Sequence, residues 1–180
     1  MIVSITTVIP HDIGAFLTKF PAHAAQIVLN VPTKKTMIPI NVTHTAIVTK
    51  EIHHRLLSAD LPSSSTAGVL PKASTNLRHT LSSIIAFFAD SYKSTFGFHD
   101  GPPLHDALTI AYVARPDLFI CTRYRVDVEL TGSHTIGETV VDIWKYKDVD
   151  DTWGRTGCNC LVANSLNVNR SSIISRAIAF

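Results

Sequence analysis

A histidine followed directly by an aspartate is the residue pair in this sequence best suited to acid–base or metal chemistry. It occurs as His11-Asp12, His99-Asp100 and His105-Asp106. Imidazole can donate or accept a proton near neutral pH, and a carboxylate can bind a hard cation such as Ca²⁺. Such pairs also arise by chance on protein surfaces, and that is the simpler interpretation of any single one.

The third pair stands in a setting that would hold it rigidly. It follows Gly101-Pro102-Pro103, whose prolines restrict the backbone, and it leads into the apolar segment 107–114. His105 is therefore the candidate general acid. Asp106, at the expected start of a helix, could either bind a cation or cap the helix, because a carboxylate there is favoured by the helix dipole.

The helices that would position this pair are indicated by hydrophobic periodicity. Residues 76–96 form the longest pattern, with apolar side chains three and four positions apart and Gly97 as the terminator. Shorter helices are expected over 23–31, 51–57, 105–114 and 169–180. Thr49 is the expected N-cap of the helix over 51–57. The segment from Pro62 to Thr75 is expected to be a loop, because it is rich in proline, serine and threonine.

Strands are expected mainly later in the chain. Residues 124–130 alternate apolar and polar side chains, which is typical of a half-buried strand. Residues 139–146 would be its partner, with turn residues between Gly132 and Gly137. Further strands are expected over 36–40 and 158–163. Helices and strands mixed in this way predict an α/β or α+β protein.

Composition limits the classes of protein that fit. The chain has 180 residues, is 46% hydrophobic and 17% charged, and carries a formal net charge of +2. These values predict a folded core and exclude a mostly disordered chain or a protein with a concentrated basic surface for nucleic acid. No apolar run is long enough for a membrane span, and the first residues lack a cationic signal-peptide region. The three cysteines are expected to be reduced. A cytoplasmic protein with no nucleic-acid or membrane partner is the expectation.

Three segments, in order, resemble one family. Gly101–Leu108, with the sequence Gly-Pro-Pro-Leu-His-Asp-Ala-Leu, is similar to the late signature of the inosine/uridine-preferring nucleoside hydrolases. Parts of Met37–Thr49 resemble the middle segment of that family, and parts of Val128–Asp142 resemble its downstream hairpin. The similarity runs from about 23 to 168, corresponds to the C-terminal half of the family, and is greatest to fungal uridine nucleosidases.

The resemblance implies a fold, a reaction and site residues. The fold would be α/β, with helices around a mixed sheet and a late antiparallel hairpin. The reaction would be hydrolysis of the N-glycosidic bond of uridine or inosine, giving ribose and free base, in nucleoside catabolism and nucleotide salvage. A bound Ca²⁺ would hold the ribose and a water, His105 would protonate the departing base, and Asp106 would be one calcium ligand. Family members commonly form homo-oligomers.

Two aromatic residues lie just upstream of the histidine pair. Tyr92 and Phe96 occupy the side on which the family lines its base pocket. The resemblance therefore makes both candidates for contact with the base. Packing in the core is the alternative for each.

The sequence departs from the family at its start. The family's Asp-x-Asp-Pro-Gly-x-Asp-Asp cluster is absent, and residues 1–22 match nothing in the family. The expected division is a non-matching segment 1–22 followed by a partial nucleoside hydrolase domain 23–180. Ca²⁺ takes about six to eight oxygen ligands, of which Asp106 would supply one or two. The acidic run Asp148–Asp151 is interpreted as a solvated loop. Two hypotheses stay open: a hydrolase impaired by N-terminal truncation, or a catalytically inactive remnant or interaction module of the same family.

Three other histidines raise the question of a zinc site. His53 and His54 are adjacent on an expected helix and would point about 100° apart, so at most one could share a metal with His44. The sequence favours a solvated helix face for them.

Overall fold

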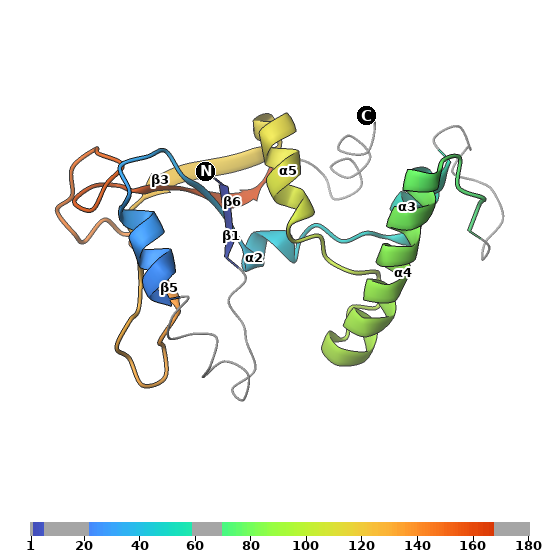
Figure 1. Cartoon of the computed structure of the whole chain (residues 1–180), viewed down its shortest axis with the longest axis horizontal. Helices are drawn as coiled ribbons and strands as arrows, with labels where there is room; N and C mark the ends of the chain where they lie inside the picture. The colour runs from blue at the N-terminus through green and yellow to red at the C-terminus, as the bar shows by residue number, and fades with distance from the viewer. Residues whose placement is uncertain (1, 6–21, 59–69, 168–180) are drawn as a thin grey trace. The chain divides into compact units, whose positions relative to one another are not determined.

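The computed structural model describes residues 2–5, 22–58 and 70–167 (Figure 1). The chain divides into two compact units, each described here by itself. Unit 1 comprises Met1–Val42 and Phe119–Leu166, and unit 2 comprises Thr43–Leu118 and Asn167–Phe180. The helix expected over 169–180, the pair His11-Asp12 and most of the loop expected over 62–75 lie outside the described residues.

Unit 1 is built on a four-stranded mixed sheet. Across the sheet the strands are β1 (Ile2–Ile5), β2 (Thr36–Pro39), β6 (Cys160–Leu166) and β3 (Phe119–Tyr124). β2 runs parallel to both β1 and β6, whereas β3 is antiparallel to β6. A separate antiparallel hairpin is formed by β4 (Val126–Val128) and β5 (Thr139–Val141). This is the α/β architecture with a late hairpin that the sequence predicts.

The strand expected over 124–130 is wrong in its extent. The ladder between β3 and β6 ends at the pair Tyr124 and Cys160. At Val126, two residues after Tyr124, the side-chain amide of Asn159 takes the place of a neighbouring strand. Its Oδ1 accepts from Val126 N at 2.8 Å and its Nδ2 donates to Val126 O at 2.8 Å. The chain therefore leaves the sheet at Arg125 and re-forms as the short strand β4. β5 is likewise shorter than the expected 139–146. β6 begins two residues later than the expected strand over 158–163 and continues to Leu166.

The core of unit 1 lies between the sheet and a helix over residues 22–30. Ala22, Ala25 and Leu29 recur at helical spacing and share the face that packs on the strands. The buried cluster consists of Ala22, Leu29, Met37, Val126, Val128, Cys160 and Val162. Burial raises the pKa of the Cys160 thiol to about 11, and all three cysteines are free.

Unit 2 is helical. The chain enters it within the short helix α2 (Ile40–Thr43) and continues through α3 (Lys50–Leu57), α4 (Asn76–Phe96), α5 (Ala107–Ala114) and the 3-10 turn η1 (Pro116–Leu118). Thr49 caps α3 as expected, by accepting from Ile52 N. α4 has the bounds that its periodicity predicts, with Thr75 as N-cap and Gly97 in the left-handed region at φ 73°. None of the described helices has the length and apolar character needed to cross a bilayer.

α5 begins two residues later than expected. His105 and Asp106 precede it in a tight turn, in which their carbonyls accept from Leu108 N and Thr109 N at 3.0 Å. Asp106 occupies the N-cap position, but its side chain makes no capping hydrogen bond. Of the two roles left open for Asp106, helix capping is therefore not the one its carboxylate performs here.

Candidate active site around His105

The backbone before His105 is held by a short paired segment. Val48 N donates to Pro102 O at 2.9 Å, and Leu104 N donates to Ala46 O at 2.9 Å. Gly101 permits this approach: its φ is 135°, and a Cβ there would lie 2.0 Å from Val48 O. Any larger residue at 101 would force the two segments apart.

Both ring nitrogens of His105 meet a hydroxyl group. Thr43 Oγ1 lies 2.8 Å from Nδ1, and Tyr92 Oη lies 2.8 Å from Nε2. Thr43 is the last residue of α2 and is buried, and Tyr92 comes from α4. Two residues that are distant in sequence, Thr43 and Tyr92, thus fix the plane of the imidazole ring of His105.

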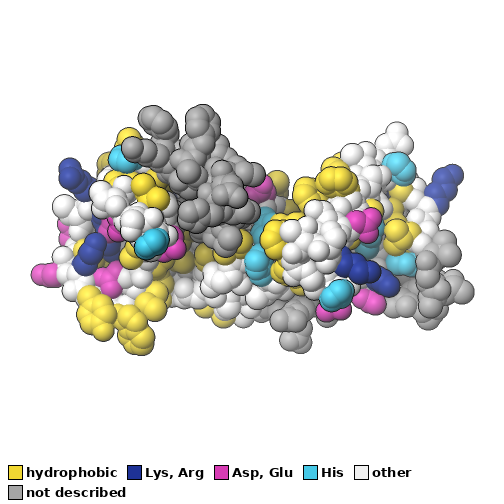
Figure 2. Space-filling model, turned by 90° about the horizontal axis from the view of Figure 1, so that it is seen from below, with side chains coloured by type: hydrophobic (Ala, Val, Ile, Leu, Met, Phe, Trp, Pro, Cys, Tyr) yellow, Lys and Arg dark blue, Asp and Glu magenta, His cyan; other side chains and the backbone are white. Residues whose placement is uncertain are grey.

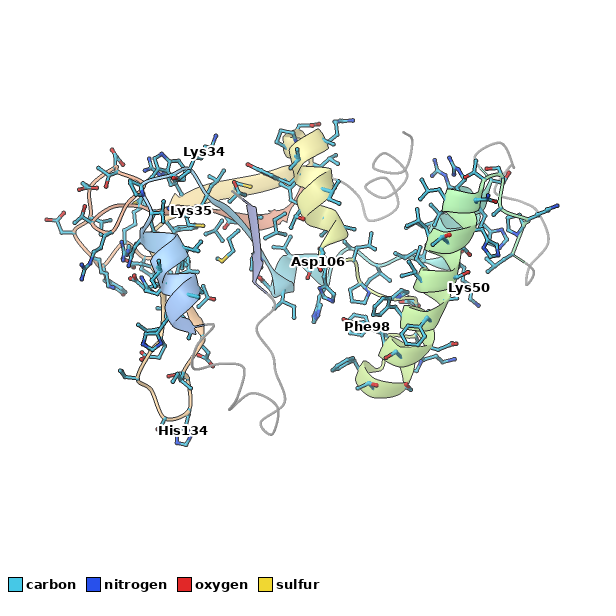
Figure 3. All side chains as sticks on the ribbon, in the orientation of Figure 1. Lys34, Lys35, Lys50, Phe98, Asp106 and His134 are labelled. Carbon is cyan, nitrogen blue, oxygen red and sulfur yellow. The ribbon has the colours of Figure 1, made fainter. Side chains whose placement is uncertain are left out.

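Aromatic rings surround the imidazole. The ring centroids of His44 and Tyr92 lie 5.4 Å and 5.8 Å from that of His105. Phe98 closes the group at 5.3 Å from His44 and 5.7 Å from Tyr92, and it lies beside α4 in Figure 3. The ring of Phe96 lies tilted against that of Tyr92, with centroids 5.3 Å apart, but Phe96 is 63% exposed, so it does not belong to a buried core.

The surroundings favour the neutral form of His105. Burial lowers the pKa of the imidazole below its ordinary value near 6.5, the neighbouring His44 lowers the pKa further, and Asp106 raises it by less. At neutral pH the ring therefore carries one N–H and one lone pair, and it becomes an effective proton donor only after the free nitrogen has taken up a second proton. Which nitrogen carries the hydrogen depends on the roles of the two hydroxyls.

The described residues do not fit a calcium site. Asp106 is exposed, and no three His, Cys, Asp or Glu side chains among the described residues gather as metal ligands. A single carboxylate supplies far fewer than the about six to eight oxygens that Ca²⁺ takes.

The acidic run near the end of the chain is the solvated loop that the sequence indicates. Asp148, Asp150 and Asp151 are exposed, and Asp150 accepts hydrogen bonds within the loop, from Thr152 N at 2.9 Å and from Thr156 Oγ1 at 3.0 Å.

The interpretation of His53 as part of a solvated helix face is wrong. Its side chain is only 8% exposed, and its Nε2 lies 2.7 Å from Ser82 Oγ on α4. Because α4 packs on α3, the face of α3 that carries His53 is covered. His44, in contrast, is exposed and belongs to the group of rings around His105.

The sequence singles out His105, Asp106 and Tyr92 as candidates, but it does not point to Thr43 or Phe98 as neighbours of the imidazole. Thr43 lies inside a segment that resembles the family, so its position was a signal, but its pairing with His105 is a long-range contact that no local pattern reveals. Phe98 follows the terminator Gly97 by one residue, outside any periodic pattern.

The structure is that of an α/β protein in which two hydroxyl groups hold the imidazole of His105. The sequence profile described as "Inosine-uridine preferring nucleoside hydrolase" matches residues 20–172. The chain belongs to the inosine-uridine preferring nucleoside hydrolase family.

Individual relatives agree with this assignment. The chain is 32% identical over 147 residues to a probable ribonucleoside hydrolase of Dictyostelium discoideum, covering 82% of this chain and 38% of that protein. It is 31% identical over 119 residues to the inosine-uridine preferring nucleoside hydrolase of Crithidia fasciculata, covering 66% of this chain and 33% of the relative.

A solved structure shows the same fold. The purine-preferring ribonucleoside hydrolase from Gardnerella vaginalis superposes with a TM-score of 0.61 at 24% identity, covering 86% of this chain and 43% of that one. The chain thus spans less than half the length of each of these three proteins.

Proposed function

We propose that this chain is part of a nucleoside hydrolase that cleaves the N-glycosidic bond of ribonucleosides, with uridine and inosine as substrates. Water adds across the C1′–N bond, so the ribose gains a hydroxyl group and the base gains a proton. The observation that supports the proposal is His105 held between two hydroxyls in the segment that resembles the family's late signature.

His105 is the proposed general acid. As the C1′–N bond breaks, negative charge develops on the departing base. His105, protonated to the imidazolium before this step, gives the base a proton and is left as neutral imidazole; such a proton transfer typically contributes about 10²–10⁴-fold to the rate. Tyr92, bonded to Nε2, lies beside the proton being transferred. Phe96 extends the aromatic surface next to Tyr92, where a flat base can stack.

Asp106 is the proposed contributor of one ligand to the Ca²⁺ that the family resemblance implies. Its carboxylate is exposed and makes no capping bond, which leaves its position compatible with that role. The described residues do not complete such a site, so the reaction proposed for this chain rests on His105. We also propose a cytoplasmic location, a role in nucleoside catabolism, and association between copies, as the family resemblance implies.

The second candidate function is a catalytically inactive remnant or interaction module of the same family. One observation supports it: no three His, Cys, Asp or Glu side chains of the described residues come together as metal ligands.

A hydrolysis assay separates the two candidates. The purified chain is incubated with uridine and with inosine, with and without Ca²⁺, and free base is measured. We expect turnover that His105→Ala lowers by about 10²–10⁴-fold. His99→Ala is the matched control, because His99-Asp100 is an exposed pair of the same kind in the neighbouring loop. Asp106→Ala tests the calcium ligand, and Asp100→Ala is its control. No release of base under any condition would support the inactive remnant instead.

A further inference from the structure

α4 carries Tyr92 to the site, yet few contacts determine where this helix lies. It is 21 residues long, and none of its side chains is buried in the described structure. Apolar side chains such as Leu77, Ile84 and Phe87 are 69%, 48% and 71% exposed, and hydrophobic side chains also lie open on the face shown in Figure 2. Because packing does not enclose α4, specific polar contacts must contribute much of its placement.

Polar contacts of this kind join the first half of α4 to α3. Ser82 Oγ lies 2.7 Å from Nε2 of the buried His53. Arg78 donates through Nη1 to the carbonyls of Leu56 and Arg55, at the end of α3. Carbonyls in the last turn of a helix lack partners within the helix, so a cation is favoured there. We call the His53–Ser82 and Arg78 contacts the α3–α4 clasp.

α3 is in turn tied to the segment that carries His105. Thr49, its N-cap, directly follows Val48, which donates to Pro102 O at 2.9 Å. Leu104, adjacent to His105, donates to Ala46 O at 2.9 Å. Within unit 2 these contacts therefore lead from His105 back to His105. The paired segments join His105 to α3, the clasp joins α3 to α4, and Tyr92 joins α4 to His105.

We propose that His53 and Ser82 are positioning residues for the candidate active site: their contact sets α4 so that the Tyr92 hydroxyl meets His105. A straight helix rises about 1.5 Å per residue, so Ser82 and Tyr92 lie roughly 15 Å apart along α4. The helix carries the effect because its backbone is a rigid rod over that length. This inference rests on the proposed function, because it concerns the placement of Tyr92 in the candidate active site. Its test does not require the chain to hydrolyse nucleosides.

The test measures by NMR, at one fixed pH, the nuclear Overhauser contact between the rings of Tyr92 and His105 in the whole chain, isotopically labelled at histidine and tyrosine. The two ring centroids lie 5.8 Å apart, and Tyr92 Oη lies 2.8 Å from Nε2 of His105. In Ser82→Ala we expect this contact to weaken, because α4 is no longer held to His53. Ser82→Thr, which keeps the hydroxyl, restores the contact.

Two comparisons make the result specific. Ser83→Ala removes a hydroxyl from the next position of α4, where it donates to His79 O within the helix, and leaves the contact between Tyr92 and His105 unchanged. In Tyr92→Phe the hydroxyl contact with His105 is lost while the NMR signals of His53 stay the same, because the clasp itself is intact.

The inference is overturned if Ser82→Ala changes the NMR signals of His53, showing that the clasp is broken, while the contact between the rings of Tyr92 and His105 stays as strong as before. An equal weakening of that contact in Ser83→Ala also overturns it, since that variant leaves the clasp intact. The readout does not depend on turnover, so a chain that fails to hydrolyse nucleosides can still support the clasp, and an active chain can still contradict it.

Discussion

At the scale of single residues, the site depends on hydroxyl groups that hold one imidazole. Thr43 is 1% exposed, and its Oγ1 lies 2.8 Å from His105 Nδ1. Thr43→Val has nearly the same shape but leaves the ring nitrogen without this partner, at a cost of about 1–3 kcal/mol. We expect the free energy of unfolding of unit 2 to fall by that amount in urea titrations followed by the helical circular dichroism signal. Thr43→Ser, which keeps the hydroxyl, is the control. A valine variant as stable as the parent would show that the contact contributes nothing.

Single residues also show what local signals can indicate. The pair His105-Asp106 stands out in the sequence itself, and Tyr92 is a candidate because it lies just upstream of that pair in a chain that resembles the family; the roles of all three stay predictions. Thr43 was missed because it meets His105 only after the chain has returned through 62 residues. His53 was misplaced for the same reason: its burial depends on Ser82, a residue of another helix.

At the scale of elements, local signals again decide what can be predicted. α4 was predicted from residue 76 to 96 because its apolar spacing and its terminator Gly97 are adjacent in sequence. The break between β3 and β4 is not predicted by any local pattern. It depends on the side-chain amide of Asn159, which bonds to the backbone of Val126 across more than thirty residues of sequence.

The contacts of Asn159 at the break between β3 and β4 allow a prediction about the stability of unit 1. Its buried amide accepts from Val126 N and donates to Val126 O and Leu29 O. Asn159→Leu leaves three backbone groups unpaired, and each costs roughly 1–3 kcal/mol, so a loss of about 3 kcal/mol or more is expected. Urea unfolding followed by tryptophan fluorescence measures it, because both tryptophans lie in unit 1. Asn164→Ala, at an exposed position of β6, is the control and should change stability by less than about 0.5 kcal/mol. Equal stability of the two variants would contradict this role of Asn159.

At the scale of the whole molecule, the two units differ in the pH range over which acid lowers their stability. In unit 2, burial lowers the pKa of both His53 and His105, with His54 and His44 lowering them further. Histidines with a lowered folded-state pKa stabilise the fold above their ordinary value near 6.5, and this contribution is lost as the pH falls through the folded-state values. In unit 1, burial raises the pKa of Asp127, but hydrogen bonds from Arg125, Lys147 and Gln26 outweigh that effect and hold it at about 2. Its contribution is present above the ordinary value of 3.8 and is lost only between there and about pH 2.

The two units should therefore lose stability in different pH ranges. On acidification from pH 7, we expect the stability of unit 2, followed by helical circular dichroism, to fall below about pH 6.5, before that of unit 1, followed by tryptophan fluorescence. His53→Gln and His105→Gln should flatten the first decline and leave the second in place. Asp127→Asn should lower the stability of unit 1 at neutral pH and remove the decline between pH 3.8 and about 2. Coincident acid transitions by both probes, unaltered by the histidine substitutions, would show that these two imidazoles do not set the acid stability of unit 2.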